Sequence, residues 1–127
     1  MAGKMQEGIY SIQEHHATHL HWDLRLEKDG ILKSWALPKM PTNGLGIKRL
    51  AIQTEDHDMD YAFFEGEIAE GNYGAGTVKV FDKGICKFLE YDENKKCIVE
   101  IRGKKLNGLF ILLKLRKKME WLFFKKK

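Results

Sequence analysis

The sequence lacks the apolar runs that mark targeting and membrane-spanning segments. No uninterrupted apolar stretch follows its basic start, and no later stretch approaches the length that crosses a bilayer. We therefore expect a cytoplasmic protein with no secretory signal and no membrane span. Its 127 residues can enclose one sizeable core but leave no room for a second. We predict a single domain over residues 1–127.

Cysteine is also scarce, because the chain contains only Cys86 and Cys97. The two residues stand far apart, form no C-x-x-C pair and lie in apolar, strand-like surroundings. This pattern argues against a disulfide scaffold and against a redox motif. We predict that both thiols are reduced and buried.

Two well-known motifs are incomplete. His15 and His19 have the H-x-x-x-H spacing of zinc proteases, but His16 stands where those enzymes need glutamate. The glycine-rich segment 71–77 lacks both the Gly-Lys-Ser/Thr ending of a phosphate-binding loop and a helical pattern after it. We expect a tight turn that redirects a strand there.

No segment of ten or more residues carries a helical stripe, whereas several short runs alternate apolar and polar residues with period two. Asp29 and Gly30 suit a two-residue hairpin turn, and residues 38–46 form a long loop rich in proline and glycine. Strands are expected over 20–27, 31–37, 49–55, 61–68, 77–81, 85–89, 97–102, 109–115 and 119–124. Together they predict an all-β fold, a small closed β-barrel of about eight strands with little helix.

Charge is distributed unevenly along the chain. Residues 114–127 hold seven Lys or Arg against the single Glu120, a local charge of +6, while the whole chain carries +4. The basic end could attract a polyanion electrostatically. It could equally be a solubilising tail.

Four of the five histidines fall within seven residues. In a strand, residues two apart share a face, so His19, His21, Asp23 and Arg25 line one side of the predicted strand. His15 precedes that strand and can fold back to complete a set of two histidines and one carboxylate. Mixed nitrogen and oxygen ligands of this kind suit manganese, iron or zinc better than calcium or magnesium.

A second polar cluster, Glu55 to Tyr61, ends the third predicted strand and holds the remaining histidine, His57. A metal, the fork of Arg25 and a neighbouring His and Tyr together describe a site for a phosphate group. The metal and the cations would neutralise charge, and the His or Tyr could move a proton.

Three segments combine specific motifs in order over nearly the whole chain. They read HHATHLHWDLRLEKDGILKSWALPK, KRLAIQTEDHDMDYAFFEGEIAEGNYGAGTVKVFDKG and LNGLFILLKLRKKMEWLFFKKK. The motifs within them are H-H-A-x-x-L-H-x-D-x-R-L-E, E-D-H-x-x-D-Y and E-G-x-Y-G-A-G. This combination resembles the 3′-phosphoesterase domain of bacterial DNA ligase D, which also occurs as free-standing proteins.

The resemblance implies a small β-barrel enzyme that repairs the 3′ ends of broken DNA with a divalent metal, preferably Mn²⁺, with Co²⁺ or Zn²⁺ as substitutes. Such enzymes remove a 3′-terminal ribonucleoside and then the 3′-phosphate, leaving a 3′-OH for a DNA ligase or polymerase. Their substrates are DNA or RNA/DNA 3′ ends. By motif position, the implied metal ligands are His15, His21 and Asp23. The implied residues around the phosphate are Arg25, Lys39, Arg49, Glu55, His57 and Tyr61.

The two other histidines of the cluster have different expected roles. His16 alternates away from His15, so we expect a structural hydrogen bond in place of metal ligation. His19 stands where the family usually has another polar or basic residue. We expect the loss of His16 or His19 to affect the chemistry least.

Two other functions compete with this interpretation. His21, Asp23 and a later histidine follow the order of the facial triad in iron- and 2-oxoglutarate-dependent oxygenases. Alternatively, the basic end and aromatics such as Trp35 and Trp121 could form a non-catalytic module that binds nucleic acid. The alternating pattern places these aromatics in the core, which weakens the second alternative.

Overall fold

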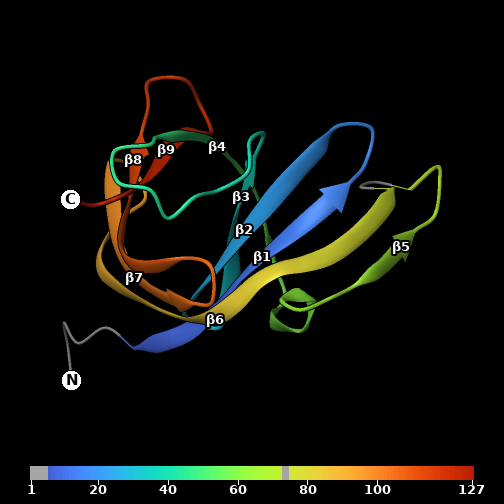
Figure 1. Cartoon of the computed structure of the whole chain (residues 1–127), viewed down its shortest axis with the longest axis horizontal. Coiled ribbons are helices and arrows are strands. Elements are labelled where there is room, and N and C mark those ends of the chain that lie inside the picture. Colours follow the sequence, from blue (N-terminus) through green and yellow to red (C-terminus); the bar gives the residue numbers. More distant parts are fainter. Residues whose placement is uncertain (1–5, 73–74) are drawn as a thin grey trace.

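The computed structural model describes residues 6–72 and 75–127, and these residues form strands with a single short 3₁₀ helix (Figure 1). The elements are β1 (Glu7–His16), β2 (Leu20–Lys28), β3 (Ile31–Leu37), β4 (Arg49–His57), η1 (Met59–Tyr61), β5 (Gly66–Ile68), β6 (Gly76–Asp92), β7 (Lys96–Gly103), β8 (Asn107–Lys114) and β9 (Glu120–Lys125). Among the described residues, no helix has the length and apolar character needed to cross a membrane.

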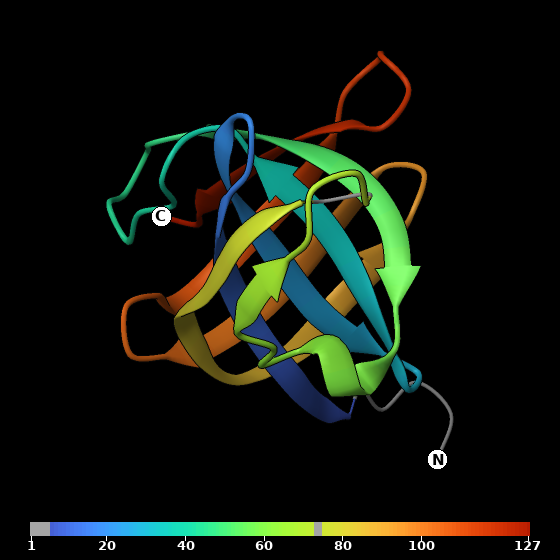
Figure 2. The same ribbon diagram turned by 90° about the vertical axis from the view of Figure 1, so that its right-hand side faces the viewer.

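The sheet closes on itself. Its order is β1-β2-β3-β4-β9-β8-β7-β6-β5, all neighbours are antiparallel, and β6 also pairs with β1. The β1–β6 pairing makes a closed barrel of eight strands, and β5 pairs with the first residues of β6 on the edge opposite β1 (Figure 2). The prediction of a small closed barrel of about eight strands with little helix is confirmed.

The barrel interior is apolar. Its largest buried side chains include Tyr10, Leu24, Trp35, Phe110 and Trp121. Burying each of them contributes roughly 1.5–3 kcal/mol relative to exposure. The rings of Trp35 and Trp121 meet edge to face with centroids 6.0 Å apart. The two tryptophans are therefore core residues and cannot stack on nucleic-acid bases.

Both cysteines are free and buried, as predicted. Burial raises the pKa of the Cys86 thiol to about 12 and that of Cys97 to about 11. Thiols with such pKa values are almost entirely protonated at neutral pH and are poor nucleophiles.

Three predicted features differ from the structure. The first strand, Glu7–His16, is absent from the prediction. The strand expected over 61–68 is wrong in its first part, where η1 and a turn precede the short β5. The strands expected over 77–81 and 85–89 are one continuous strand, β6. Tyr73 and Gly74, within the turn expected at 71–77, lie outside the described residues.

β6 continues through Asp82, Lys83 and Gly84, which look like a turn when only neighbours in sequence are considered. Its register with β1 shifts there, because Ile12 pairs with Asp82 and Gln13 pairs with Val80. Such a bulge bends a strand without ending it. A Cβ on Gly84 would collide with the carbonyl oxygen of Arg102 on β7. The glycine therefore permits close strand packing and does not mark a loop.

Candidate active site

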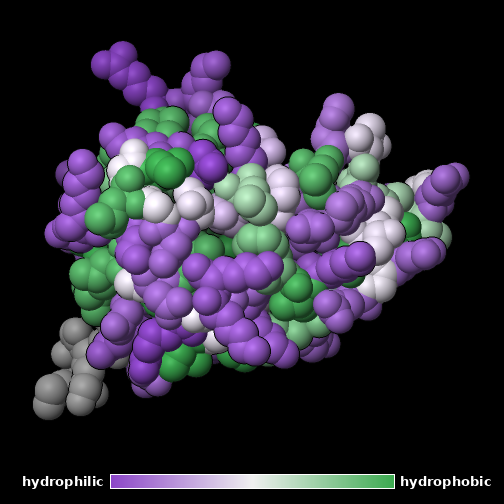
Figure 3. Space-filling model, viewed as in Figure 1, coloured by the Kyte–Doolittle hydropathy of each residue, from purple (hydrophilic) through white to green (hydrophobic). Residues whose placement is uncertain are grey.

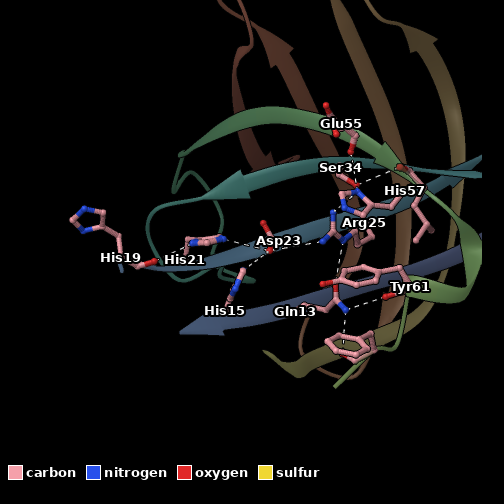
Figure 4. A network of polar contacts seen from close by, with 12 residues as sticks. Gln13, His15, His19, His21, Asp23, Arg25, Ser34, Glu55, His57 and Tyr61 are labelled. Carbon is pink, nitrogen blue, oxygen red and sulfur yellow. Dashed lines mark hydrogen bonds and ion pairs between the residues drawn. The ribbon is translucent and has the colours of Figure 1, made fainter. Parts of the chain in front are cut away.

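A pocket of about 540 Å³ lies on the face of β1 and β2 that points away from the barrel interior. Along β2, Asp23 and Arg25 alternate with the core residues Leu24 and Leu26, so strand geometry directs the two polar side chains to the opposite face. Figure 4 shows these side chains converging from neighbouring strands. The pocket is lined by His15, Ala17, His21, Asp23, Arg25, Ala36, Thr54, Glu55, His57, Tyr61 and Ile68.

Cross-strand pairing brings His15, His21 and Asp23 together. His15 on β1 is directly opposite His21 on β2, and Gln13 is opposite Asp23. The Asp23 Oδ2 atom lies 3.5 Å from His15 Nδ1 and 3.4 Å from His21 Nε2 (Figure 4). His15 therefore reaches the group as part of a paired strand, whereas the sequence predicted that it precedes the His21 strand and folds back.

The chemistry of this group fits a transition metal. One donor atom from each of the three side chains lies within 4.8 Å of the others. Ligands about 2.0–2.2 Å from a shared ion stand at comparable separations, and two imidazoles with one carboxylate suit zinc, iron or manganese. The Nδ1 atom of His21 lies 3.0 Å from the carbonyl oxygen of His19. With Nδ1 donating to that carbonyl, Nε2 is the nitrogen that faces Asp23, and it would bind an ion after losing its proton.

The electrostatics of Asp23 favour the ionised carboxylate. Burial alone would raise its pKa, but the hydrogen bond with His21 and the charge of Arg25 prevail, so the pKa is lowered. The same hydrogen bond raises the pKa of His21. A carboxylate that remains charged at neutral pH is the form that binds a cation.

Arg25 connects the His15–His21–Asp23 group to the second polar cluster. Its side chain is only 4% exposed, and its Nη2 lies 3.8 Å from Asp23 Oδ2. Its Nε donates to Gln13 Oε1 at 2.9 Å, and its Nη1 donates to His57 Nδ1 at 3.1 Å. The guanidinium carbon also lies 5.1 Å from the centre of the Tyr61 ring. These contacts fix a positive charge between the His15–His21–Asp23 group and His57.

His57 and Tyr61 stack with ring centroids 5.1 Å apart. Burial and the nearby Arg25 charge lower the pKa of His57, so its ring is neutral at pH 7. Its Nδ1 lies 3.1 Å from Arg25 Nη1 and 2.9 Å from the Glu55 carbonyl oxygen. Nδ1 cannot accept a hydrogen bond from Arg25 and donate one to the Glu55 carbonyl at the same time. The buried charge favours acceptance from Arg25, which places the ring proton on Nε2.

Gln13 belongs to the site although the sequence prediction omits it. It is fully buried, and its Nε2 donates to the carbonyl oxygens of Tyr61 and Phe64 at 3.0 and 3.1 Å. Its other amide atom accepts from Arg25. Gln13 thereby ties η1 and the segment after it to β1 and holds Arg25 in place. The alternation of Tyr10, Ile12 and Gln13 could have indicated a strand, but a lone glutamine carries no chemical signature.

The remaining predicted site residues are placed differently. Glu55 lines the pocket. Lys39 is exposed in the loop after β3 and Arg49 begins β4, where its Nε donates to the Met40 carbonyl oxygen at 2.8 Å. Neither Lys39 nor Arg49 is among the pocket-lining residues of the described chain. The structure thus brings together seven of the nine predicted residues and leaves these two cations outside.

His16 and His19 lie apart from the His15–His21–Asp23 group. The His16 ring lies 2.6 Å from Oε2 of Glu14, and the other carboxylate oxygen, Oε1, accepts from the Trp22 indole. His19 precedes β2 in a turn, so it does not share the strand face with His21 as predicted. Its exposed ring points away from the pocket, and only its carbonyl contacts His21 (Figure 4).

The fold and the pocket together define a class of protein: a small antiparallel β-barrel with a partly buried His-His-carboxylate group beside an arginine and a stacked His-Tyr pair. The family model of the DNA ligase D 3′-phosphoesterase domain matches residues 13–114, which is most of the chain. This chain belongs to that family. The group that could hold a metal contains His15 and not the later His57, so the residue order of an oxoglutarate-dependent oxygenase is not reproduced there.

Two relatives illustrate the match. The chain is 44% identical over 125 residues to the multifunctional non-homologous end joining protein LigD of Pseudomonas aeruginosa, covering 93% of this chain and 15% of that protein. It is 44% identical over 108 residues to the multifunctional non-homologous end joining DNA repair protein LigD of Mycobacterium tuberculosis, covering 83% of this chain and 14% of that protein. The chain therefore corresponds to about one seventh of either relative's length.

Proposed function

We propose that this protein is a metal-dependent phosphoesterase that removes the 3′-phosphate from DNA ends and leaves a 3′-OH. One observation supports this most strongly: His15, His21 and Asp23 share a pocket with Arg25 and His57. A group that can bind a divalent cation next to a fixed guanidinium is suited to a dianionic phosphate. Membership of the phosphoesterase family supports the same assignment.

The metal ligands would be His15, His21 and Asp23, and we propose Mn²⁺ as the ion, with Co²⁺ or Zn²⁺ as substitutes. When bound, such an ion polarises a phosphoryl oxygen and makes a coordinated water more acidic. Hydrolysis consumes one water molecule: its oxygen bonds to phosphorus, the bond from phosphorus to the 3′ oxygen breaks, and that oxygen gains a proton.

Arg25 and His57 would hold the phosphate during this exchange. The guanidinium of Arg25 is already fixed by Gln13 and His57, so it can neutralise developing charge without reorganising. A neutral His57 that loses its Nε2 proton would become an anion, which is unfavourable beside a phosphate. We therefore assign His57 a hydrogen bond to a phosphate oxygen, with the stacked Tyr61 fixing the plane of its ring.

The outlying cations Lys39 and Arg49 are proposed to contact phosphates farther along the strand, because both lie outside the pocket. Glu55 is proposed to orient the end of the strand, since it lines the pocket without joining the metal group. As a second activity we propose removal of a 3′-terminal ribonucleoside. A DNA ligase or polymerase would use the resulting 3′-OH.

The test uses a 5′-labelled DNA primer on a template, ending in a 3′-phosphate or in one ribonucleotide. Products are separated by electrophoresis after incubation with Mn²⁺, Co²⁺, Zn²⁺ or EDTA. We expect a 3′-OH product that requires metal, loss of that product in His21→Ala and His57→Ala, and little change in His19→Ala. Binding of the primer without any end conversion in every metal would refute the esterase assignment.

A further inference from the structure

The turn between β8 and β9, Leu115–Met119, has a well-defined shape. The Lys114 ammonium donates to the carbonyl oxygens of Leu115 and Lys117 at 2.8 and 2.9 Å. The amide of Leu115 donates to the Glu120 carbonyl oxygen at 2.9 Å. These bonds hold the backbone of the turn, which projects from the barrel in Figures 1 and 2.

The turn presents concentrated positive charge. Arg116, Lys117 and Lys118 are consecutive and exposed, and within residues 6–72 and 75–127 none of them forms an ion pair. Figure 3 shows long hydrophilic side chains extending from the part of the surface where Figure 1 places this turn. Three such cations on an ordered turn form a ready contact for a polyanion.

The same turn is connected to the candidate active site. The Gln53 amide on β4 donates to the Met119 carbonyl oxygen at 2.7 Å. Gln53, Thr54, Glu55 and Met119 line a second hollow of about 710 Å³. Thr54 and Glu55 also line the site pocket. The two hollows therefore share Thr54 and Glu55 on β4, and Met119 of the basic turn lines the second one.

We propose that Arg116, Lys117 and Lys118 bind the sugar-phosphate backbone of the DNA whose 3′ end occupies the site pocket. This inference deepens the proposed function and rests on it. The carboxylate of Glu55 repels phosphate, and the side chain of Met119 is apolar and 43% exposed. The hollow therefore suits the uncharged parts of a nucleotide. The cations of the turn next to it would contact the phosphates.

The expected effect follows from counterion release. Each phosphate neutralised by a Lys or Arg contributes about −0.9 to the slope of log K against log salt concentration for duplex DNA. Two contacts therefore account for about a tenfold fall in affinity between 50 and 200 mM salt. Removing two of the three cations should remove that share of the salt dependence.

The test compares two double variants with equal changes in charge. Lys117→Ser with Lys118→Ser removes cations from the turn, and Lys104→Ser with Lys105→Ser removes exposed cations at the other end of β8. Fluorescence anisotropy measures the Kd of a labelled primer-template bearing a 3′-phosphate, without metal, from 50 to 200 mM KCl. We expect only the turn variant to bind more weakly at 50 mM and to lose about 1.8 of the salt slope. Equal behaviour of the two variants overturns the inference.

A turnover measurement separates this inference from the proposed function. With Mn²⁺, the turn variant should have a raised KM for primer-template and an unchanged rate on a deoxynucleoside 3′-monophosphate, which is too short to reach the turn. If the wild type hydrolyses neither substrate, the proposed function fails, while the anisotropy result still decides the role of the turn. Equal loss on both substrates would show that the variant damages the pocket, and would contradict a backbone contact.

Discussion

Asp23 and Asp82 are both buried carboxylates, with 8% and 4% of their surface exposed, yet their surroundings differ. Asp82 accepts hydrogen bonds from the Tyr10 hydroxyl and the backbone amides of Lys104, Lys105 and Leu106, at 2.8 to 3.1 Å. Short bonds from neutral donors use its lone pairs fully. Asp82 is therefore an internal anchor for the β7–β8 turn.

Asp23 faces charged or ionisable side chains at longer distances. His15, His21 and Arg25 approach its Oδ2 at 3.5, 3.4 and 3.8 Å. Burial would raise the pKa of both aspartates, but hydrogen bonds, assisted at Asp23 by the Arg25 charge, lower both. Burial and a lowered pKa therefore do not distinguish a functional carboxylate from a structural one. The identity and spacing of the partners do.

The largest expected difference is in activity. Asp23→Asn removes the negative charge from the group formed with His15 and His21. It should lower kcat on a 3′-phosphate primer by about 10²–10³-fold, the usual cost of removing one group that stabilises a transition state. Asp82→Asn should retain at least half of the wild-type rate at a temperature where it is folded. Steady-state kinetics on both variants makes the comparison, and similar losses would refute it.

The second difference is in stability. Asp82→Asn turns an acceptor of four hydrogen bonds into a group with one acceptor oxygen, which leaves buried donors unsatisfied. The free energy of unfolding should fall by about 1–3 kcal/mol. Urea denaturation followed by tryptophan fluorescence measures the change. A loss from Asp23→Asn as large as that from Asp82→Asn would contradict the assigned roles.

Substitution of Arg25 tests whether activity requires the guanidinium that lies between the His15–His21–Asp23 group and His57. Lysine at this position cannot donate to Gln13 and His57 together from one planar group. Loss of one charge-assisted hydrogen bond, worth roughly 1.5 kcal/mol, should lower kcat about tenfold in Arg25→Lys. Single-turnover kinetics separates this effect from product release, and a wild-type rate would show that the fork is unnecessary.

The pH dependence of stability gives a smaller expected difference, which comes from Asp82. The pKa of Asp82 is lower in the folded protein, so its contribution to stability is complete above the unfolded value of about 4 and is lost as pH falls through the folded pKa. The wild type should therefore lose stability below about pH 4 more steeply than Asp82→Asn. Urea denaturation between pH 2.5 and 6 tests this, and parallel curves would exclude Asp82 as a source of the acid sensitivity.

His19→Ala should have the smallest effect. Its ring is exposed, and the backbone carbonyl that contacts His21 is retained in the variant. We expect kcat and KM within about twofold of wild type, because a surface substitution away from specific contacts costs little. A loss comparable to that of His21→Ala would place His19 in the site.

The sequence predicts the strands with one polar and one apolar face most accurately. Residues 20–27 and 31–37 nearly coincide with β2 and β3, and the positions of His21 and Asp23 follow from that alternation. β1 escapes prediction because part of its polar face is buried against the segment after η1, where Gln13 bonds the Tyr61 and Phe64 carbonyls. The formation of β1 depends on contacts between segments that are distant in sequence, and local periodicity does not reveal such contacts.

In the candidate site, too, features within one strand are predicted from the sequence, and features that depend on distant segments are not. Residue types and spacing within one strand predicted His21, Asp23 and Arg25 as neighbours. The position of His15 depends on β1–β2 register, and that of Gln13 depends on a segment 48 residues later in the sequence. The role of Asp82 cannot be predicted from its neighbours in sequence, because its four donors come from Tyr10 and from residues 104–106.

Direct measurement of Mn²⁺ binding tests the central claim, that Asp23 with His15 and His21 holds a metal and Asp82 does not. Isothermal titration calorimetry at neutral pH would compare the wild type, Asp23→Asn and Asp82→Asn after each is shown to be folded by circular dichroism. We expect one ion bound with equal affinity by the wild type and Asp82→Asn, and at least about tenfold weaker binding by Asp23→Asn. Equal affinity in all three proteins would contradict the account.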